Sequence, residues 1–334
     1  MPRNLFSWWL TLFFGAFVLT SYTIAITRHP PIRPPLRSSG MESIPLENKE
    51  ESTRDHRPGK IILSDPSLSE PYGVVRVGDK LVLVDANRSS GRGVVRVFSM
   101  VTQDALPSLA QGFRFPAGLA LWSNERLLLV DNGGGGSLIL LGAEGEEKRL
   151  SDPLDDPKDV AADVGRGRIF VADRGNNRVL VLDEDFVTID SWAPPDDHFV
   201  PNGLALGHQG RLFVSDKAGA RVWVFSREGK VEGSWGRSGR DMPEEMALPG
   251  GVAVDPWGRV YVADYARDSI HVFSREGDHI GLMGGEEAND PSFGRPRGLF
   301  YDAVSGRLLV TGGDRQLNVA RVWSLPLWQL GSAE

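Results

Sequence analysis

The chain has 334 residues, of which 41% are hydrophobic and 24% are charged, a balance typical of a globular protein. Cysteine is absent, which excludes disulfides, thiolate metal ligands and cysteine nucleophiles. The net charge of the chain is −7, and the first 60 residues carry +3, from eight Lys and Arg against five Asp and Glu. Residues 61–334 therefore carry −10, which argues against general nucleic-acid binding.

The N-terminus begins with an apolar segment, and residues 5–26 contain no charged side chain. A helix of 22 residues rises roughly 33 Å, enough to cross the hydrocarbon core of a bilayer. We therefore expect residues 1–27 to form an N-terminal membrane anchor, the alternative being a cleaved signal peptide with a weak site at Thr23-Ile24-Ala25. An anchor with a short positive head and a long trailing domain usually exports that domain, so we expect an extracytoplasmic body.

Residues 28–59 have the composition of a linker. They contain several charges, little apolar content and six prolines, at positions 30, 31, 34, 35, 45 and 58. Such a segment cannot bury enough apolar surface to offset its ordering entropy. We predict a disordered, proline-rich spacer here and a folded domain over residues 60–334.

An internal repeat organises that domain. Each unit opens with a proline followed two residues later by Gly or Asp and then by a short apolar strand; the opening residues are Pro71, Pro116, Pro157, Pro201, Pro249 and Pro296. The spacings of 45, 41, 44, 48 and 47 residues are those of a four-stranded propeller blade. The repeat therefore predicts six blades.

Each unit continues with a second strand that ends in aspartate in five of the six units, at Asp85, Asp131, Asp173, Asp216 and Asp264. A loop of hairpin length, a third strand, a Gly turn and a fourth strand follow. Because the aspartates recur at the start of a tight loop, we expect them to accept backbone N–H bonds rather than to catalyse. Arg178 and Arg221 open third strands and are candidate partners for them.

Two segments resemble the NHL repeat closely: PGGVAVDPWGRVYVADYARDSIHVFSREG at residues 249–277, and DPKDVAADVGRGRIFVADRGNNRVLVLDEDF at residues 156–186. The resemblance extends over roughly residues 60–325 and implies an all-β fold, a six-bladed β-propeller of four-stranded antiparallel blades behind one N-terminal transmembrane helix.

The strand count predicts how the ring closes. The sixth unit ends shortly after its third strand, and Gly59-Lys60-IILS precedes the first unit where a fourth strand is needed. We predict that residues 60–64 supply the outer strand of the last blade, which removes an open sheet edge.

Residues that differ between units are the candidates for function. The position after the opening proline should lie near the central channel, and it holds Tyr72, Ala117, Lys158, Asn202, Gly250 and Arg297. Asp159 is the single carboxylate at the next position, and loops expected on the same face add Arg174, Asn177 and Arg267. We predict a ligand-binding face made by Tyr72, Lys158, Asp159, Asn202, Arg297, Arg174, Asn177 and Arg267.

The repeat predicts a complete propeller, but the candidate residues do not form a complete catalytic set. We therefore expect a binding scaffold for a protein, peptide or glycan rather than an enzyme. We expect no cofactor and no nucleic-acid partner. The alternative is a metal-dependent hydrolase or lyase. Val200-Pro201-Asn202 resembles the channel Asn segment of gluconolactonase and strictosidine synthase-like propellers, which implies a divalent cation such as Ca²⁺ on Asn202 and Asp159. The fold also resembles peptidyl-amidoglycolate lyase, but the histidines here share no repeat position for its zinc.

Overall fold

The structure is a computed structural model, which describes residues 60–87, 90–123, 125–150, 152, 154–284, 294–313 and 320–327. Within these ranges no helix is long and apolar enough to span a bilayer. The predicted anchor of residues 1–27 and the predicted linker of residues 28–59 lie outside the described residues.

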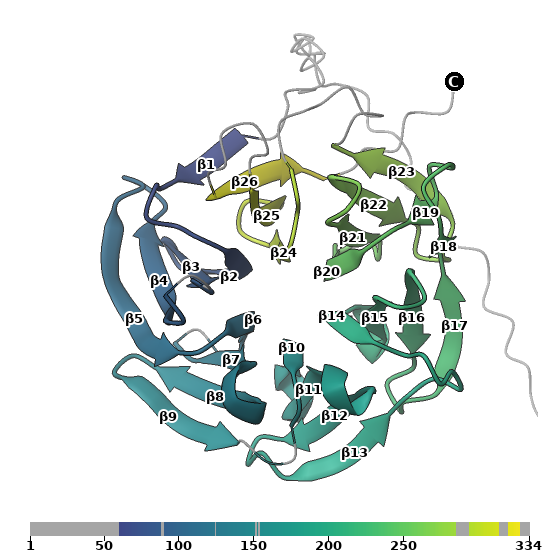
Figure 1. The fold of residues 1–334 in the computed structure, drawn as a ribbon, viewed down its shortest axis with the longest axis horizontal. Coiled ribbons are helices and arrows are strands. Elements are labelled where there is room, and N and C mark those ends of the chain that lie inside the picture. The colour runs from purple at the N-terminus through teal and green to yellow at the C-terminus, as the bar shows by residue number, and fades with distance from the viewer. Residues whose placement is uncertain are drawn as a thin grey trace, which may run out of the picture. The chain divides into compact units, whose positions relative to one another are not determined.

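Six four-stranded antiparallel sheets surround a central axis (Figure 1). Blade 1 contains β2 (Pro71–Val77), β3 (Lys80–Asp85), β4 (Gly93–Ser99) and β5 (Ala105–Phe113). Blade 2 contains β6 (Pro116–Leu121), β7 (Leu127–Asp131), β8 (Ser137–Gly142) and β9 (Gly145–Leu150). Blade 3 contains β10 (Pro157–Asp163), β11 (Arg168–Asp173), β12 (Arg178–Asp183) and β13 (Thr188–Trp192).

Blade 4 contains β14 (Pro201–Leu206), β15 (Leu212–Asp216), β16 (Arg221–Phe225) and β17 (Val231–Trp235). Blade 5 contains β20 (Pro249–Val254), β21 (Val260–Asp264), β22 (Ser269–Phe273) and β23 (His279–Met283). Blade 6 contains β24 (Leu299–Asp302), β25 (Arg307–Gly313), β26 (Ala320–Pro326) and β1 (Lys60–Ser64).

The turns contribute four short 3₁₀ helices within the described ranges: η1 (Gly133–Gly135), η2 (Val164–Arg166), η3 (Arg174–Asn176) and η4 (His208–Gly210). Between blades 4 and 5, β18 (Arg237–Ser238) and β19 (Glu245–Met246) pair in parallel as an insertion.

The core lies between neighbouring blades. The second strands of the blades are almost wholly buried, as in β15, where every residue is buried. One cluster joins Val160, Ile169 and Leu180 of blade 3 to Leu128 and Leu138 of blade 2. Each blade therefore buries its faces only against its neighbours, so the closed ring is the cooperative unit.

The ring closes as predicted, because β1 pairs antiparallel with β26 from Lys60 opposite Ser324 to Ser64 opposite Arg321. Two further contacts join blade 6 to blade 1. The Thr311 hydroxyl donates to the Tyr72 carbonyl at 2.5 Å, and Arg76 forms an ion pair with Asp302 at 3.0 Å.

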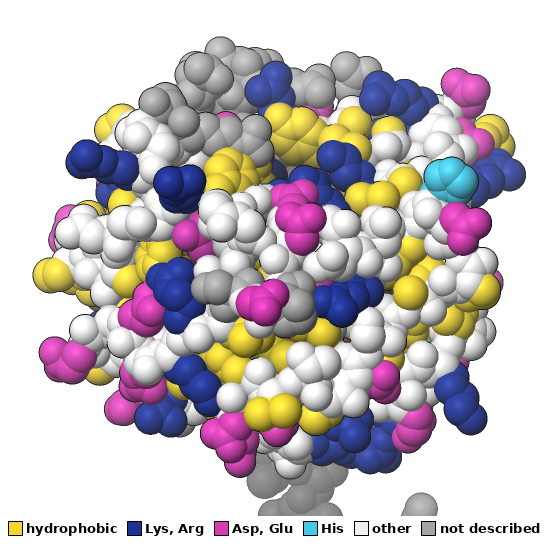
Figure 2. Space-filling model, turned by 60° about the horizontal axis from the view of Figure 1, so that its bottom comes forward, with side chains coloured by type: hydrophobic (Ala, Val, Ile, Leu, Met, Phe, Trp, Pro, Cys, Tyr) yellow, Lys and Arg dark blue, Asp and Glu magenta, His cyan; other side chains and the backbone are white. Residues whose placement is uncertain are grey.

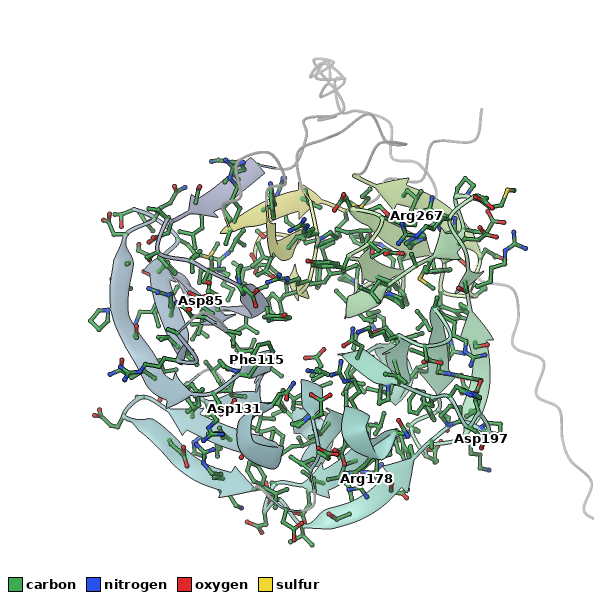
Figure 3. The ribbon with its side chains drawn as sticks, viewed as in Figure 1. Asp85, Phe115, Asp131, Arg178, Asp197 and Arg267 are labelled. Atoms are coloured by element: carbon green, nitrogen blue, oxygen red, sulfur yellow. The ribbon has the colours of Figure 1, made fainter. Side chains whose placement is uncertain are left out.

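The repeated aspartates are structural, as expected. All five are buried, and in blades 1–5 each lies opposite the opening proline of its blade. Asp85 accepts from the Ser69 and Glu70 N–H groups, and Asp131 accepts from those of Arg114 and Phe115 (Figure 3). They therefore hold the loop that enters each blade.

The two arginines that open third strands also have the structural role suggested for them. Arg178 forms an ion pair with Asp173 at 2.7 Å, and Arg221 forms one with Asp216 at 3.1 Å. In blade 6 Gly312 takes the aspartate position, and the strand starts at Leu299, three residues after its opening proline.

Candidate functional site

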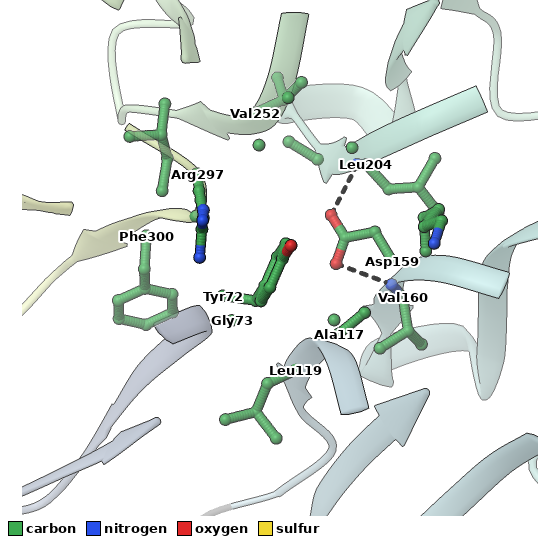
Figure 4. A pocket seen from close by; sticks show the side chains of 18 of the residues that line it. Tyr72, Gly73, Ala117, Leu119, Asp159, Val160, Leu204, Val252, Arg297 and Phe300 are labelled. Atoms are coloured by element: carbon green, nitrogen blue, oxygen red, sulfur yellow. Dashed lines mark hydrogen bonds between the residues drawn. The ribbon is translucent and has the colours of Figure 1, made fainter. Parts of the chain in front are cut away.

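A cavity of about 610 Å³ runs along the propeller axis. Its wall consists of the innermost strands β2, β6, β10, β14, β20 and β24, together with the loops that enter these strands and the loops that follow the second strands (Figure 4). This volume is in the range of small-molecule sites, and convergent polar groups around such a cavity are typical of a ligand site.

The structure brings together six of the eight predicted site residues. Tyr72, Lys158, Asp159, Asn202, Arg297 and Arg174 all line the cavity. Asn177 and Arg267 are not among the lining residues. Arg267 instead donates to the carbonyls of Met242 and Glu245, which fixes the β18–β19 insertion, and Asn177 adopts the left-handed conformation (φ 51°) that ends η3.

Sequence reasoning missed Glu70, Phe115 and Tyr265, which also line the cavity. In blades 1, 2, 4 and 5 the residue after the buried aspartate donates its N–H to the carbonyl of the residue before the opening proline, as Tyr265 does to Leu248. Both positions are thus carried to the channel mouth. In the sequence, these residues could have been found as the ones that differ between units at two positions: directly before the opening proline and directly after the aspartate.

Cations and aromatic rings contact one another in a row that runs around most of the mouth. The Lys158 ammonium lies 5.5 Å from the Phe115 ring, and Phe115 meets Tyr72 edge-on with centroids 5.8 Å apart. The Arg297 guanidinium lies 4.8 Å from the Tyr72 ring and 5.5 Å from the Tyr265 ring. These five residues, which we call the mouth row, come one each from blades 3, 2, 1, 6 and 5.

Carboxylates orient the cations of the mouth row. Asp156 forms an ion pair with Lys158 at 2.9 Å and with Arg174. Glu70 lies 3.9 Å from the Arg297 guanidinium. Both cations are largely shielded, with side chains 14% and 17% exposed, so each acts in an environment of lower dielectric than bulk water. Counting lining residues, four Lys and Arg face two carboxylates, whereas the whole chain is acidic.

Asp159 stands at the position where the other five blades carry glycine: Gly73, Gly118, Gly203, Gly251 and Gly298. A Cβ at Gly203 would approach the Gly250 carbonyl to 2.3 Å, and one at Gly298 would approach that of Tyr72 to 2.0 Å. At the glycine positions neighbouring inner strands are therefore too close for a side chain. Between blades 3 and 4 the Asp159 carboxylate fills this space and accepts from the Leu204 and Val160 N–H groups, both at 2.9 Å.

Burial raises the pKa of Asp159 to about 7, although the hydrogen bonds from Leu204 and Val160 oppose the shift. The carboxyl group is therefore part protonated at neutral pH. A proton-carrying carboxyl group that faces a cavity can act as a general acid or base or can donate a hydrogen bond to a ligand.

The unfolded carboxyl group releases its proton near 3.8, and the folded one releases it near 7. The folded state therefore binds more protons between these values, and stability falls as pH rises across this window. We expect the stability of Asp159→Asn relative to the natural protein to rise by about 2 kcal/mol between pH 4 and pH 8, after allowance for water in the channel.

Urea denaturation at several pH values measures this difference. The exposed Asp185→Asn in the same blade is the matched control and should show a flat difference. A pH-independent difference for Asp159→Asn would contradict the raised pKa.

Asn202 and Asp159 do not form a ready cation site. The Asn202 amide donates to the Pro249 carbonyl at 2.9 Å, and both Asp159 oxygens accept backbone N–H groups. In the described ranges no three or more His, Asp or Glu side chains are grouped as metal ligands would be. A divalent cation needs several oxygen ligands, so these two residues do not fit the cation suggested by the resemblance.

Comparison with known proteins agrees with the geometry. An NHL repeat matches residues 154–182, and no curated protein matches the chain. A gluconolactonase structure from Xanthomonas campestris superposes with a TM-score of 0.61 at 22% identity, covering 81% of this chain and 96% of that one. Virginiamycin B lyase from Staphylococcus aureus gives 0.55 at 14% identity, covering 78% and 86%.

A nidogen/laminin complex contains a further similar structure, with a TM-score of 0.54 at 15% identity, covering 69% of this chain and 84% of that one. At such identities the similarity establishes the fold alone, and these proteins differ in what they do. The repeats, the six sheets and the matched segment agree: the chain is a six-bladed β-propeller that contains an NHL repeat at residues 154–182.

Proposed function

We propose that this protein is a membrane-anchored binding propeller, held by residues 5–26, that recognises an anionic group of a protein, peptide or glycan ligand at its channel mouth. The main support for this proposal is the mouth row, which places Lys158 and Arg297 against aromatic faces around one opening. Partly desolvated cations bind carboxylates more strongly than exposed ones, and aromatic faces add contact area.

The distribution of charge supports this choice of ligand. The lining residues are net positive, whereas residues 61–334 are net negative. On the side of the molecule shown in Figure 2, basic and acidic side chains are interspersed. An anion is therefore attracted to the mouth in particular, and a mixed surface disfavours polyanions such as RNA.

Benzoate and benzamide make a matched pair of probes, since they share the aromatic ring and differ in charge. We expect benzoate to bind and benzamide to bind at least tenfold more weakly, as measured by ligand-observed NMR. In the double variant Lys158→Gln, Arg297→Gln, benzoate binding should weaken by at least tenfold, because each charge-assisted hydrogen bond contributes about 1.5–3 kcal/mol.

Arg211→Gln is the control, because Arg211 pairs with Glu232 on the outer strand of blade 4 and does not line the cavity. Equal binding of the two probes, or an unchanged affinity in the double variant with its unfolding midpoint intact, would overturn the proposal.

The rival function is a metal-dependent hydrolase or lyase working at the same mouth. Asp159 supports acid–base chemistry there, whereas the ligand set for a cation is poor. Native mass spectrometry of the protein with added Ca²⁺ distinguishes the two. A stoichiometric ion that is lost in Asn202→Ala favours the enzyme over the scaffold.

A further inference from the structure

The channel changes character with depth. Every charged lining residue belongs either to the loops at the mouth or to the second and third positions of an inner strand. From the fourth position onward the lining residues are apolar except for Tyr301. The open part of this apolar lining is at the sixth position, where Leu121, Ala162, Leu206 and Val254 line the cavity and are half-buried. The fourth-position residues Val74, Leu119, Val160, Leu204 and Val252 are instead buried in the core between blades.

The height of these residues follows from the repeat itself. The sixth residue of an inner strand is held by equivalent pairing with the second strand, as Leu206 is opposite Leu212 and Val254 opposite Val260. Apolar surface left open inside the channel is a site for apolar groups of a ligand.

We infer that the ligand is an anionic amphiphile, whose charged head binds at the mouth row and whose single alkyl chain enters the channel beneath it. The inference rests on the proposed function for the head and adds the chain. Charge complementarity places the head at Arg297 and Lys158, and the half-buried apolar lining places the chain on the axis below them.

A series of straight-chain carboxylates tests the binding of the charged head and of the alkyl chain separately. Acetate, hexanoate and octanoate share one head, and each buried methylene tightens binding by at most about fourfold. We expect hexanoate to displace benzoate from the full-length protein in lipid nanodiscs at least tenfold more effectively than acetate does, and octanoate to exceed hexanoate. Hexanol, which lacks the charge, should displace benzoate more weakly than hexanoate.

Two variants test the depth of the channel without touching the mouth row. Ala162→Phe fills the lower channel, and Leu206→Gln makes its wall polar at a half-buried position where folding should tolerate the change. Both should flatten the dependence on chain length and leave benzoate affinity unchanged. Comparing variants in identical nanodiscs cancels partition of the probes into lipid.

The outcomes separate this inference from the proposed function. If acetate and octanoate displace benzoate equally while benzamide fails to bind, the anionic site stands and the chain site is overturned. If octanoate binds the natural protein and both variants alike, the chain lies elsewhere and the inference fails. If benzoate itself does not bind, the proposed function fails first.

Discussion

Deletion of residues 60–64 is expected to destabilise the protein by about 4 kcal/mol or more, which for a domain of this size corresponds to about 10 °C in the midpoint of thermal unfolding. The deletion removes β1, the strand through which the N-terminal end of the propeller closes the last blade. It uncovers the edge of β26 and also the hydrophobic cluster that contains Leu63, Val322 and Phe98. Both losses act on the one interface that makes the array a ring.

Two point substitutions in the same strand sharpen this test. Leu63 is 4% exposed and Ile61 is 38% exposed. Leu63→Asp should cost several kcal/mol because it places a carboxylate in an apolar cluster, whereas Ile61→Asp should change the unfolding midpoint little. Scanning calorimetry measures both. Equal effects of the two substitutions would mean that β1 adds length to the sheet without closing the core.

Asp216→Ala is expected to lower the free energy of unfolding by about 3–5 kcal/mol, a large effect for the loss of one polar side chain. Five donors converge on this buried carboxylate: the Val200, Ala218 and Gly219 N–H groups, Arg221 and Trp223. Removing it leaves buried donors without an acceptor, which costs more than the bonds themselves contribute. Urea denaturation measures the loss.

Asp216→Asn keeps the shape and removes the charge, so its stability should fall between those of the alanine variant and the natural protein. The exposed Asp197 is the control, since Asp197→Ala removes a carboxylate from the same entering loop without exposing buried donors (Figure 3). If Asp216→Ala and Asp197→Ala behaved alike, the repeated aspartate would not hold the blade loops.

The same aspartate connects stability to the site. It fixes the segment that precedes Asn202 and the loop that begins with Lys217, and both residues line the cavity. Repeated residues thus set the position of the mouth, and the unrepeated residues next to them set its chemistry. This separation lets variants at Lys158 and Arg297 alter binding while the ring remains folded.

Much of the fold could be predicted because the repeat supplies the same local signals six times. Prolines 41–48 residues apart, strands ending in aspartate and the spare strand at residues 60–64 were enough for blade number and closure. The position after the opening proline also led to the channel, where Tyr72, Lys158, Asn202 and Arg297 line one cavity. The β18–β19 insertion was not predicted, since its two-residue strands leave no periodic pattern.

By itself, then, the sequence determined the number of blades, the closing strand and the residues nearest the axis, because these depend on spacing along the chain. Only the tertiary structure decided which side chains meet across blades. The mouth row joins residues up to 225 positions apart, from Tyr72 to Arg297, and no local pattern encodes those contacts. The raised pKa of Asp159 likewise depends on burial between two inner strands, which exists only once blades 3 and 4 have packed together.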